Sequence, residues 1–336
     1  MQTTLFNNKN NIIGTNYNYL KGNVLLFNKN LFFIIILITT INLNAKSLFF
    51  PLEEPKNINK EVATLGKELF FDPILSKNND ISCFSCHSNY GADNKSFSIG
   101  TNNKIGKINS PSVFNLEKNI AYFWNGRAET LEKQLHGPLF DPSEMASSKE
   151  LIEERLKNSQ KYKELFNVAF KSEPSFANTL KAIAEYEKTL VTLNSKFDKH
   201  LRGEVALNES EQKGLNLFIS YGCASCHNGL NLGGNSFQKF GAVISPDEFD
   251  NEIWADRFAF TNDIEDKEVY KVPSLRNVEK TAPYFHSGNV VLLKTAIYMM
   301  AYHNVGVILK EDEVQYIEDF LKTLTGEIPE TFKKEQ

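Results

Sequence analysis

Two five-residue motifs of the form C-x-S-C-H constrain this chain more than any other feature. They run from Cys83 to His87 and from Cys223 to His227, and together they use all four cysteines of the 336-residue chain. Each pair of thiols can form thioether bonds with one haem, and the histidine that follows can then bind the iron as proximal ligand. We therefore predict a two-haem c-type cytochrome. The residues predicted to hold the haems are Cys83, Cys86, His87, Cys223, Cys226 and His227.

The alternatives to haem attachment are a disulfide pair, a zinc ribbon of two C-x-x-C units, and chance. A zinc ribbon needs no histidine after each second cysteine. A disulfide framework seldom repeats this spacing with no thiol left over. The C-x-x-C-H pattern is itself a signature of haem attachment, so haem attachment is the strongest of the four hypotheses.

The N-terminal segment predicts export from the cytoplasm. Its first 45 residues hold three lysines and no acidic residue, and they include the apolar run from Leu31 to Ile38 and the cleavage-like sequence Leu43-Asn44-Ala45. The apolar run is short for a transmembrane helix, which is typical of a signal peptide. We predict a signal peptide at 1–45 and a periplasmic protein. The long region before the apolar run leaves an uncleaved anchor or an upstream start-codon error as alternatives.

The charge balance disfavours nucleic acid as a partner. The whole chain has a formal charge of −4, and without the first 45 residues this becomes about −7. A mildly acidic surface suits a small basic redox protein instead.

The phrase G-x-x-L-F precedes both motifs, as Gly66 to Phe70 and as Gly214 to Phe218, which indicates an internal duplication. Apolar spacing predicts a helix before each motif and a closing helix after it. The residues behind these helices are Val62, Leu65 and Leu69; Asn208 and Glu211 as a capping box; Leu180, Ile183, Ala184 and Leu190 within 175–195; and Val314, Ile317, Phe320, Leu321 and Leu324, followed by Gly326.

The predicted fold class is all-α, because strand signals are scarce. Residues Leu151, Ile152, Leu156, Leu165 and Phe166 predict one extra helix in the first half, and Asn194 to Asn208 has the composition of a linker. We expect two cytochrome c-like domains, at 46–200 and 201–336, each with one covalently attached c-type haem.

From Gly66 to Gly326 the chain resembles the bacterial dihaem cytochrome c peroxidase family, which also contains the methylamine-utilisation enzyme that matures a tryptophan-derived cofactor. The phrases that carry the resemblance are Leu65-Gly66, Phe71-Asp72-Pro73, Phe123-Trp124-Asn125-Gly126-Arg127, Gly137-Pro138, Glu144-Met145, Tyr186-Glu187-Lys188-Thr189-Leu190, Val272-Pro273-Ser274-Leu275-Arg276-Asn277 and Pro283-Tyr284-Phe285-His286-Ser287-Gly288. Any one of them alone would be weak, whereas together they are highly specific.

The resemblance implies that the first haem reacts with hydrogen peroxide and that the second receives electrons from an external donor. Glu144 matches the family's acid–base glutamate, and Gln134 matches the amide beside it. A solvated helix face is the ordinary alternative for these two residues. Trp124 matches the tryptophan between the two haems, and it can also be a core residue. Arg127 is expected to hold structure or a haem propionate.

For the second haem, Met300 falls at the family's spacing for the distal ligand, and thioether ligation raises the reduction potential. Met299 is the second choice, because it points about 100° away around the helix. A core methionine is the ordinary alternative. The resemblance also implies a calcium ion held by the Asn109 side chain and the backbone carbonyls of Thr281 and Pro283, and oxygen-only ligation suits this hard cation.

One departure from the family concerns the loop after the first motif. Many members carry a histidine there that binds the first iron in the oxidised resting state. The aligned phrase here is Ser98-Ile99-Gly100-Thr101, and threonine is a poor ligand for ferric haem. We expect the first haem to be open in the oxidised enzyme. His136, beside Gln134, could supply such a ligand, but a loop or surface role is the favoured interpretation.

These features favour a periplasmic cytochrome c peroxidase that reduces hydrogen peroxide with electrons from a monohaem cytochrome c or a small copper protein. A dihaem electron carrier would need both irons six-coordinate and no distal acid, and Glu144 and Gln134 argue against it. A dihaem oxidase that modifies a protein substrate is the enzyme alternative. The missing loop histidine favours that oxidase, whereas Met300 does not, because the cofactor-maturing relative has a tyrosine as axial ligand. The family also suggests a homodimer.

Overall fold

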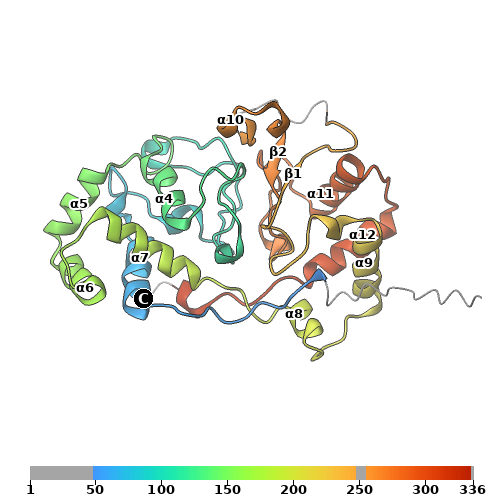
Figure 1. The fold of residues 1–336 in the computed structure, drawn as a ribbon, viewed down its shortest axis with the longest axis horizontal. Coiled ribbons are helices and arrows are strands. Elements are labelled where there is room, and N and C mark those ends of the chain that lie inside the picture. The colour runs from blue at the N-terminus through green and yellow to red at the C-terminus, as the bar shows by residue number, and fades with distance from the viewer. Residues whose placement is uncertain (1–47, 247–254, 334–336) are drawn as a thin grey trace, which may run out of the picture. The chain divides into compact units, whose positions relative to one another are not determined.

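The computed structural model describes residues 48–246 and 255–333 (Figure 1). The predicted signal peptide at 1–45 lies outside the described residues. Within them, no helix is long and apolar enough to cross a membrane. Most regular structure is helical, as predicted. The all-α prediction was incomplete, because β1 (Phe237–Lys239) and β2 (Val269–Lys271) form an antiparallel two-stranded sheet with Gln238 opposite Tyr270.

The first core forms where α2 (Lys60–Phe71) packs against α7 (Phe176–Lys188) (Figure 1). The Asn59 side chain accepts a hydrogen bond from the Val62 N–H (3.1 Å) and caps α2. Gly66 lies at the crossing point, since a Cβ there would stand 1.9 Å from the Ala182 carbonyl oxygen. The predicted helices before the first motif and after it are therefore confirmed, and they pack on each other.

The second core repeats this arrangement with α9 (Glu209–Ser220) and α12 (Glu311–Lys322). The predicted capping box is present: the Glu211 N–H donates to Asn208 Oδ1 (2.9 Å), and the Asn208 N–H donates to Glu211 Oε2 (2.8 Å). A Cβ at Gly214 would stand 1.8 Å from the Tyr316 carbonyl oxygen. The glycine of each G-x-x-L-F phrase thus permits the same close helix crossing, which gives the sequence duplication a structural cause.

Two local predictions were wrong. The single helix expected around residues 151–166 is two helices, α5 (Lys149–Asn158) and α6 (Gln160–Phe170), because Ser159 is extended and its hydroxyl accepts from the Tyr162 N–H. The expected linker contains α8 (Lys196–Leu201), which the buried Asp198–Arg276 ion pair anchors.

The remaining α-helices carry residues that line the cavity described below. They are α3 (Cys83–Cys86), α4 (Leu131–Phe140), α10 (Phe258–Thr261) and α11 (Leu293–Met300), which continues as a π-helical turn over Ala301–Val305.

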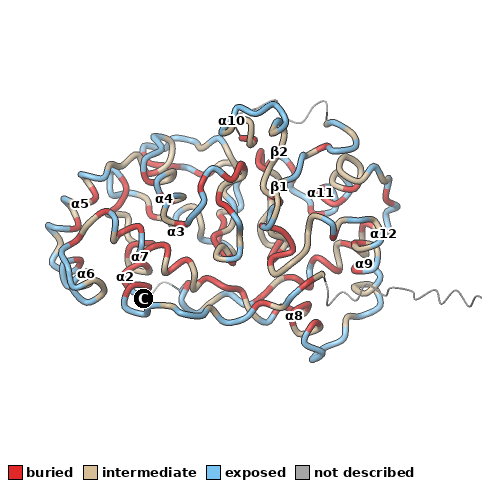
Figure 2. The backbone as a smooth tube through the Cα atoms, in the orientation of Figure 1, coloured by how far each residue is buried: buried red, intermediate tan, exposed pale blue. Residues whose placement is uncertain are grey.

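The two ends of the described chain each enter the core of the opposite half (Figure 2). Phe49 is buried edge-on against Phe197 with ring centroids 5.5 Å apart, in the core of α9 and α12. Phe332 lies 4.7 Å from the Phe114 ring, in the core of α2 and α7. The division into domains at 46–200 and 201–336 stays a prediction, and these two aromatic residues tie its halves together.

Candidate haem cavity and active site

Both C-x-S-C-H motifs line one cavity of about 1240 Å³. This exceeds the roughly 300–1,000 Å³ of an ordinary small-molecule pocket. All four cysteines are free thiols, so they form no disulfide pair. Among residues 48–246 and 255–333 there is also no group of three or more His, Cys, Asp or Glu side chains that could hold a metal ion, which argues against a zinc ribbon.

Each motif histidine is oriented by a backbone carbonyl. Nδ1 of His87 lies 2.7 Å from the Gly91 oxygen, and Nδ1 of His227 lies 3.1 Å from the Leu232 oxygen. An Nδ1–H that donates to a carbonyl leaves Nε2 free as a metal ligand. Burial lowers the pKa of His87 and lowers the pKa of His227 to about 4, so both rings are neutral at pH 7, as ligation requires. The residues present therefore fit one c-type haem at each motif.

The predicted distal residues lie in the same cavity as His87. Gln134 projects from α4, which Thr130 caps by accepting from the Lys133 N–H (3.2 Å), and Glu144 follows in the loop after the helix. Burial, and then the charge of Asp141, raise the pKa of Glu144 to about 7, whereas Arg127 opposes this. A carboxyl group that is about half ionised near pH 7 can both accept and return a proton.

Arg127 lines this cavity as well. Its guanidinium carbon lies 3.4 Å from the centroid of the Phe123 ring, and Nη1 donates to Asn125 Oδ1 (3.3 Å). The residue is exposed overall; partial burial of its guanidinium lowers its pKa, while the charges of Glu144 and Asp141 raise it. Beyond the structural role expected from the sequence, Arg127 thus acts electrostatically on Glu144.

The side chains of Thr101 and His136 contact residues outside the cavity. The wholly buried Thr101 donates its hydroxyl hydrogen bond to the Asp80 carboxylate, with both oxygens at 2.9 Å. The His136 ring lies edge-on to Phe140 and Phe176, 5.5 Å from each. Neither Thr101 nor His136 is among the described residues that line the cavity.

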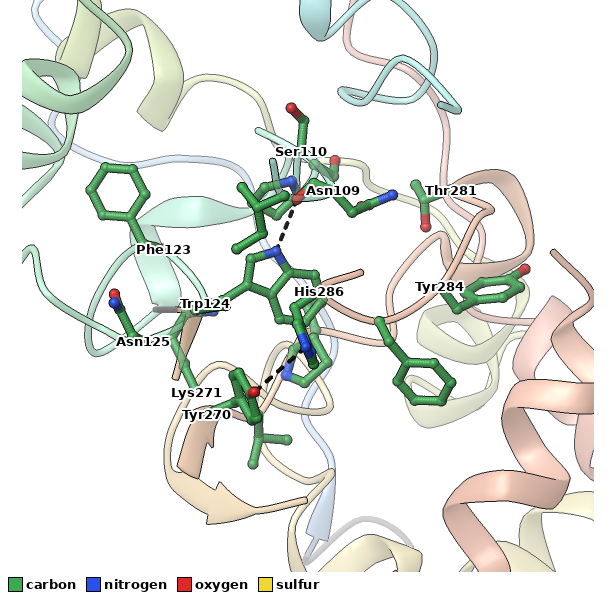
Figure 3. A pocket seen from close by; sticks show the side chains of 18 of the residues that line it. Asn109, Ser110, Phe123, Trp124, Asn125, Tyr270, Lys271, Thr281, Tyr284 and His286 are labelled. Carbon is green, nitrogen blue, oxygen red and sulfur yellow. Dashed lines mark hydrogen bonds between the residues drawn. The ribbon is translucent and has the colours of Figure 1, made fainter. Parts of the chain in front are cut away.

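Trp124 lies where the two halves of the chain meet (Figure 3). Its Nε1–H donates to the Asn109 carbonyl (2.9 Å), and its own carbonyl accepts from the Lys271 N–H (2.7 Å). The ring faces His286 edge-on at 6.3 Å, and His286 stacks on Tyr270 at 4.6 Å. The Trp124 indole is therefore held by a carbonyl of the first half, and the Trp124 backbone by an N–H of the second half.

Met300 lines the cavity at the end of α11, and Met299 does not. On the same helix Leu293, Ala296 and Ile297 are buried. The choice of Met300 over Met299 as an iron ligand stays a prediction.

The residues predicted to bind calcium lie close together. Asn109 is buried, and its Nδ2 donates to the Pro283 carbonyl (3.3 Å) and to the Lys95 carbonyl (3.2 Å). Thr281 and Pro283 line the same cavity. A cation between these carbonyls would require the Asn109 amide to turn its oxygen toward them, and the assignment of amide oxygen and nitrogen follows the hydrogen-bond network.

Glu187 and Lys271 line the cavity, and the sequence assigned a role to neither. Glu187 is 4% exposed, its Oε2 atom has no hydrogen-bond partner among the described residues, and burial followed by the charge of Glu132 raises its pKa to about 8. Burial lowers the pKa of Lys271 to about 8. Each residue sits in or directly beside a phrase that carries the family resemblance, and this position was the only signal in the sequence.

Comparisons with known proteins show which family the chain resembles over most of its length. The family model described as "Di-haem cytochrome c peroxidase" matches residues 60–206. The chain is 45% identical to the cytochrome c551 peroxidase of Nitrosomonas europaea over 83% of this chain and 84% of that protein. It is 42% identical to the cytochrome c551 peroxidase of Pseudomonas aeruginosa over 85% and 86%. It is 32% identical to the methylamine utilization protein MauG of Methylorubrum extorquens over 74% and 70%.

Solved structures share the fold. A MauG-like protein associated with microbial copper homeostasis superposes with a TM-score of 0.72 at 27% identity, over 84% of this chain and 96% of that one. The diheme peroxidase BthA of Burkholderia thailandensis superposes with a TM-score of 0.69 at 21% identity, over 83% and 90%, which shows the fold alone. With the two haem motifs in one cavity and these relatives, the chain belongs to the dihaem cytochrome c peroxidase family of oxidoreductases.

Proposed function

We propose that this protein reduces hydrogen peroxide to water. The observation that carries the proposal is the placement of Glu144, Gln134 and Arg127 in one cavity with His87, with the pKa of Glu144 near 7. When bound, the haems supply an iron that takes up the peroxide oxygen and two sites that store electrons. The overall reaction consumes one hydrogen peroxide, two electrons and two protons, and it forms two waters.

The proton steps belong to Glu144. Its ionised form would accept a proton from one oxygen of the peroxide, and its neutral form would return that proton to the other, departing oxygen. The amide of Gln134 can donate a hydrogen bond to peroxide and orient it. Arg127 holds positive charge in the same cavity, which favours the ionised form of Glu144.

Trp124 and Met300 serve electron transfer in this proposal. Trp124 lies in the cavity that both motifs line, so its aromatic ring can assist electrons that pass between the haems. Met300, together with His227, would hold the iron of the second haem. A thioether ligand raises the reduction potential, as a haem that accepts electrons from outside requires.

The setting of the reaction is part of the proposal. We propose export to the periplasm from the signal-like segment at 1–45, and a monohaem cytochrome c or a small copper protein as electron donor. The Asn109, Thr281 and Pro283 site would hold calcium. We also propose a homodimer.

The test is stopped-flow oxidation of a reduced monohaem cytochrome c by hydrogen peroxide, with the enzyme kept fully oxidised until mixing. Immediate turnover supports both the peroxidase and an open first haem, as the engagement of Thr101 with Asp80 suggests. Turnover that begins only after the enzyme has been pre-reduced supports the peroxidase activity but contradicts an open first haem in the oxidised enzyme. If pre-reduced enzyme shows no turnover with the monohaem cytochrome c, the assay is repeated with a small copper protein as donor. No turnover with either donor contradicts the peroxidase activity and favours oxidation of a protein substrate.

A further inference from the structure

Lys271 is a cation in the haem cavity that the proposed reaction does not use. It is the last residue of β2, and its backbone N–H donates to the Trp124 carbonyl (2.7 Å). Figure 3 draws it beside Trp124 among the residues around the cavity. Its position is therefore fixed at the point where the two halves of the chain meet.

Within the part of the chain that the structure describes, the ammonium group of Lys271 has no counter-charge. No carboxylate or carbonyl among residues 48–246 and 255–333 pairs with it, and burial is the sole cause that lowers its pKa. The neighbouring cations do have partners: Lys239 on β1 reaches Glu268 (3.4 Å), and Arg276 pairs with Asp198 (2.9 Å). A desolvated cation without a partner is costly, so an anion within the cavity would stabilise it.

The cavity itself limits which anion fits. Glu144, Glu187 and Asp141 also line it, so a free anion would meet three carboxyl groups. A haem attached covalently at the two cysteines of a motif is held regardless of that repulsion, and its propionate side chains are carboxylates. We propose that Lys271 holds a haem propionate beside Trp124. This inference rests on the proposed function only in that both motifs carry haem.

Such a contact makes Lys271 a positioning residue for electron transfer. A positive charge near a haem disfavours the ferric form, which is the more positive of the two oxidation states. The charge also fixes the propionate edge relative to the Trp124 ring. Loss of the charge therefore lowers the potential of the haem that it contacts.

The experiment is a spectroelectrochemical titration of both haems in wild type, Lys271→Met, Lys271→Arg and Lys267→Met. The exposed Lys267 lies outside the cavity and provides the matched loss of one charge. Lys271→Met is expected to raise the ratio of oxidised to reduced form of one haem about tenfold. This corresponds to a reduction potential lower by roughly 59 mV for a one-electron couple. Lys271→Arg and Lys267→Met should keep the wild-type potentials.

Unshifted potentials in a Lys271→Met protein that retains both haems would overturn the proposal. If Lys271→Met loses a haem, the haem content of Lys271→Gln and Lys271→Arg is compared instead. Retention of both haems in Lys271→Arg but not in Lys271→Gln supports the pairing of Lys271 with a propionate. The proposal is contradicted if Lys271→Gln retains both haems with unshifted reduction potentials. It is also contradicted if Lys271→Gln and Lys271→Arg lose haem equally. The titration needs no peroxide, so a protein that fails as a peroxidase still tests this inference.

Discussion

The Thr101 backbone N–H donates a hydrogen bond to the Glu144 carbonyl oxygen at 2.8 Å. The loop after the first haem motif is thereby tied to the loop that carries the proposed acid–base residue. Gly100 makes the approach possible, because a Cβ there would stand 2.1 Å from the Ser143 carbonyl oxygen. The loop at Thr101, where the family resemblance leads one to expect a histidine, thus holds the backbone of Glu144.

Gly100→Ala should lower kcat/KM for peroxide by about 10-fold to 100-fold. The new methyl group pushes the Glu144 loop away, and small displacements of a reacting group can cost about this much. The measurement is steady-state peroxide turnover at equal haem content. Gly106→Ala is the matched control, since its nearest neighbour would be the Ser98 carbonyl oxygen at an ordinary 3.4 Å. Equal effects of the two substitutions would argue against support of Glu144 by this loop.

The pH dependence of kcat/KM should report Glu144. Burial and Asp141 raise its pKa from 4.5 to about 7, so the carboxyl group is protonated at pH 5 and cannot accept a proton. Activity should therefore rise with pH through about 7 and then level off. Arg127→Met removes the charge that lowers this pKa and should move the midpoint to higher pH. Arg202→Met, at an exposed position, should leave the midpoint in place, and an unmoved midpoint in Arg127→Met would contradict the electrostatic role.

Glu187→Gln should change how stability depends on pH. The folded pKa of about 8 exceeds the ordinary 4.5, so the neutral form is favoured in the folded protein. Stability from Glu187 is then fully present below about 4.5 and is lost as the pH rises through 8, by on the order of a few kcal/mol. Chemical denaturation should show that, between pH 5 and 8, the free energy of unfolding of Glu187→Gln rises relative to that of the wild type. The exposed Glu173→Gln provides the control, and parallel curves for Glu187→Gln and wild type would refute the assignment.

Gly66→Ala and Gly214→Ala should each destabilise the fold by about 1–3 kcal/mol or more. Their methyl groups would meet the carbonyls of Ala182 and Tyr316 across the helix crossings. The free energy of unfolding from denaturant titration measures this. Wild-type stability in either variant would mean that the crossing tolerates a wider spacing.

The sequence predicted those parts of the structure that depend on local patterns. The capping box of Asn208 and Glu211, the helix faces and the two haem motifs follow from spacings of a few residues. The sheet was missed, because three residues per strand are too few to show an alternating pattern. The helix around Phe197 was missed because its burial depends on the distant Asp198–Arg276 pair.

Side-chain roles that depend on the tertiary fold could be predicted only in part. The absence of a loop histidine at Thr101 was visible in the sequence, but its hydrogen bond to Asp80 was not. The unusual pKa values of Glu187 and Lys271 arise from burial, which no short pattern reveals.

The most direct test of the proposed chemistry is Glu144→Gln, measured by stopped-flow reaction with hydrogen peroxide against Glu150→Gln, an exposed site on α5. With both haems retained, Glu144→Gln should lose about 10²-fold to 10⁴-fold in kcat/KM, the usual contribution of a general acid–base group. Glu150→Gln should match the wild type. Undiminished turnover in Glu144→Gln would contradict the assignment of proton transfer to this residue.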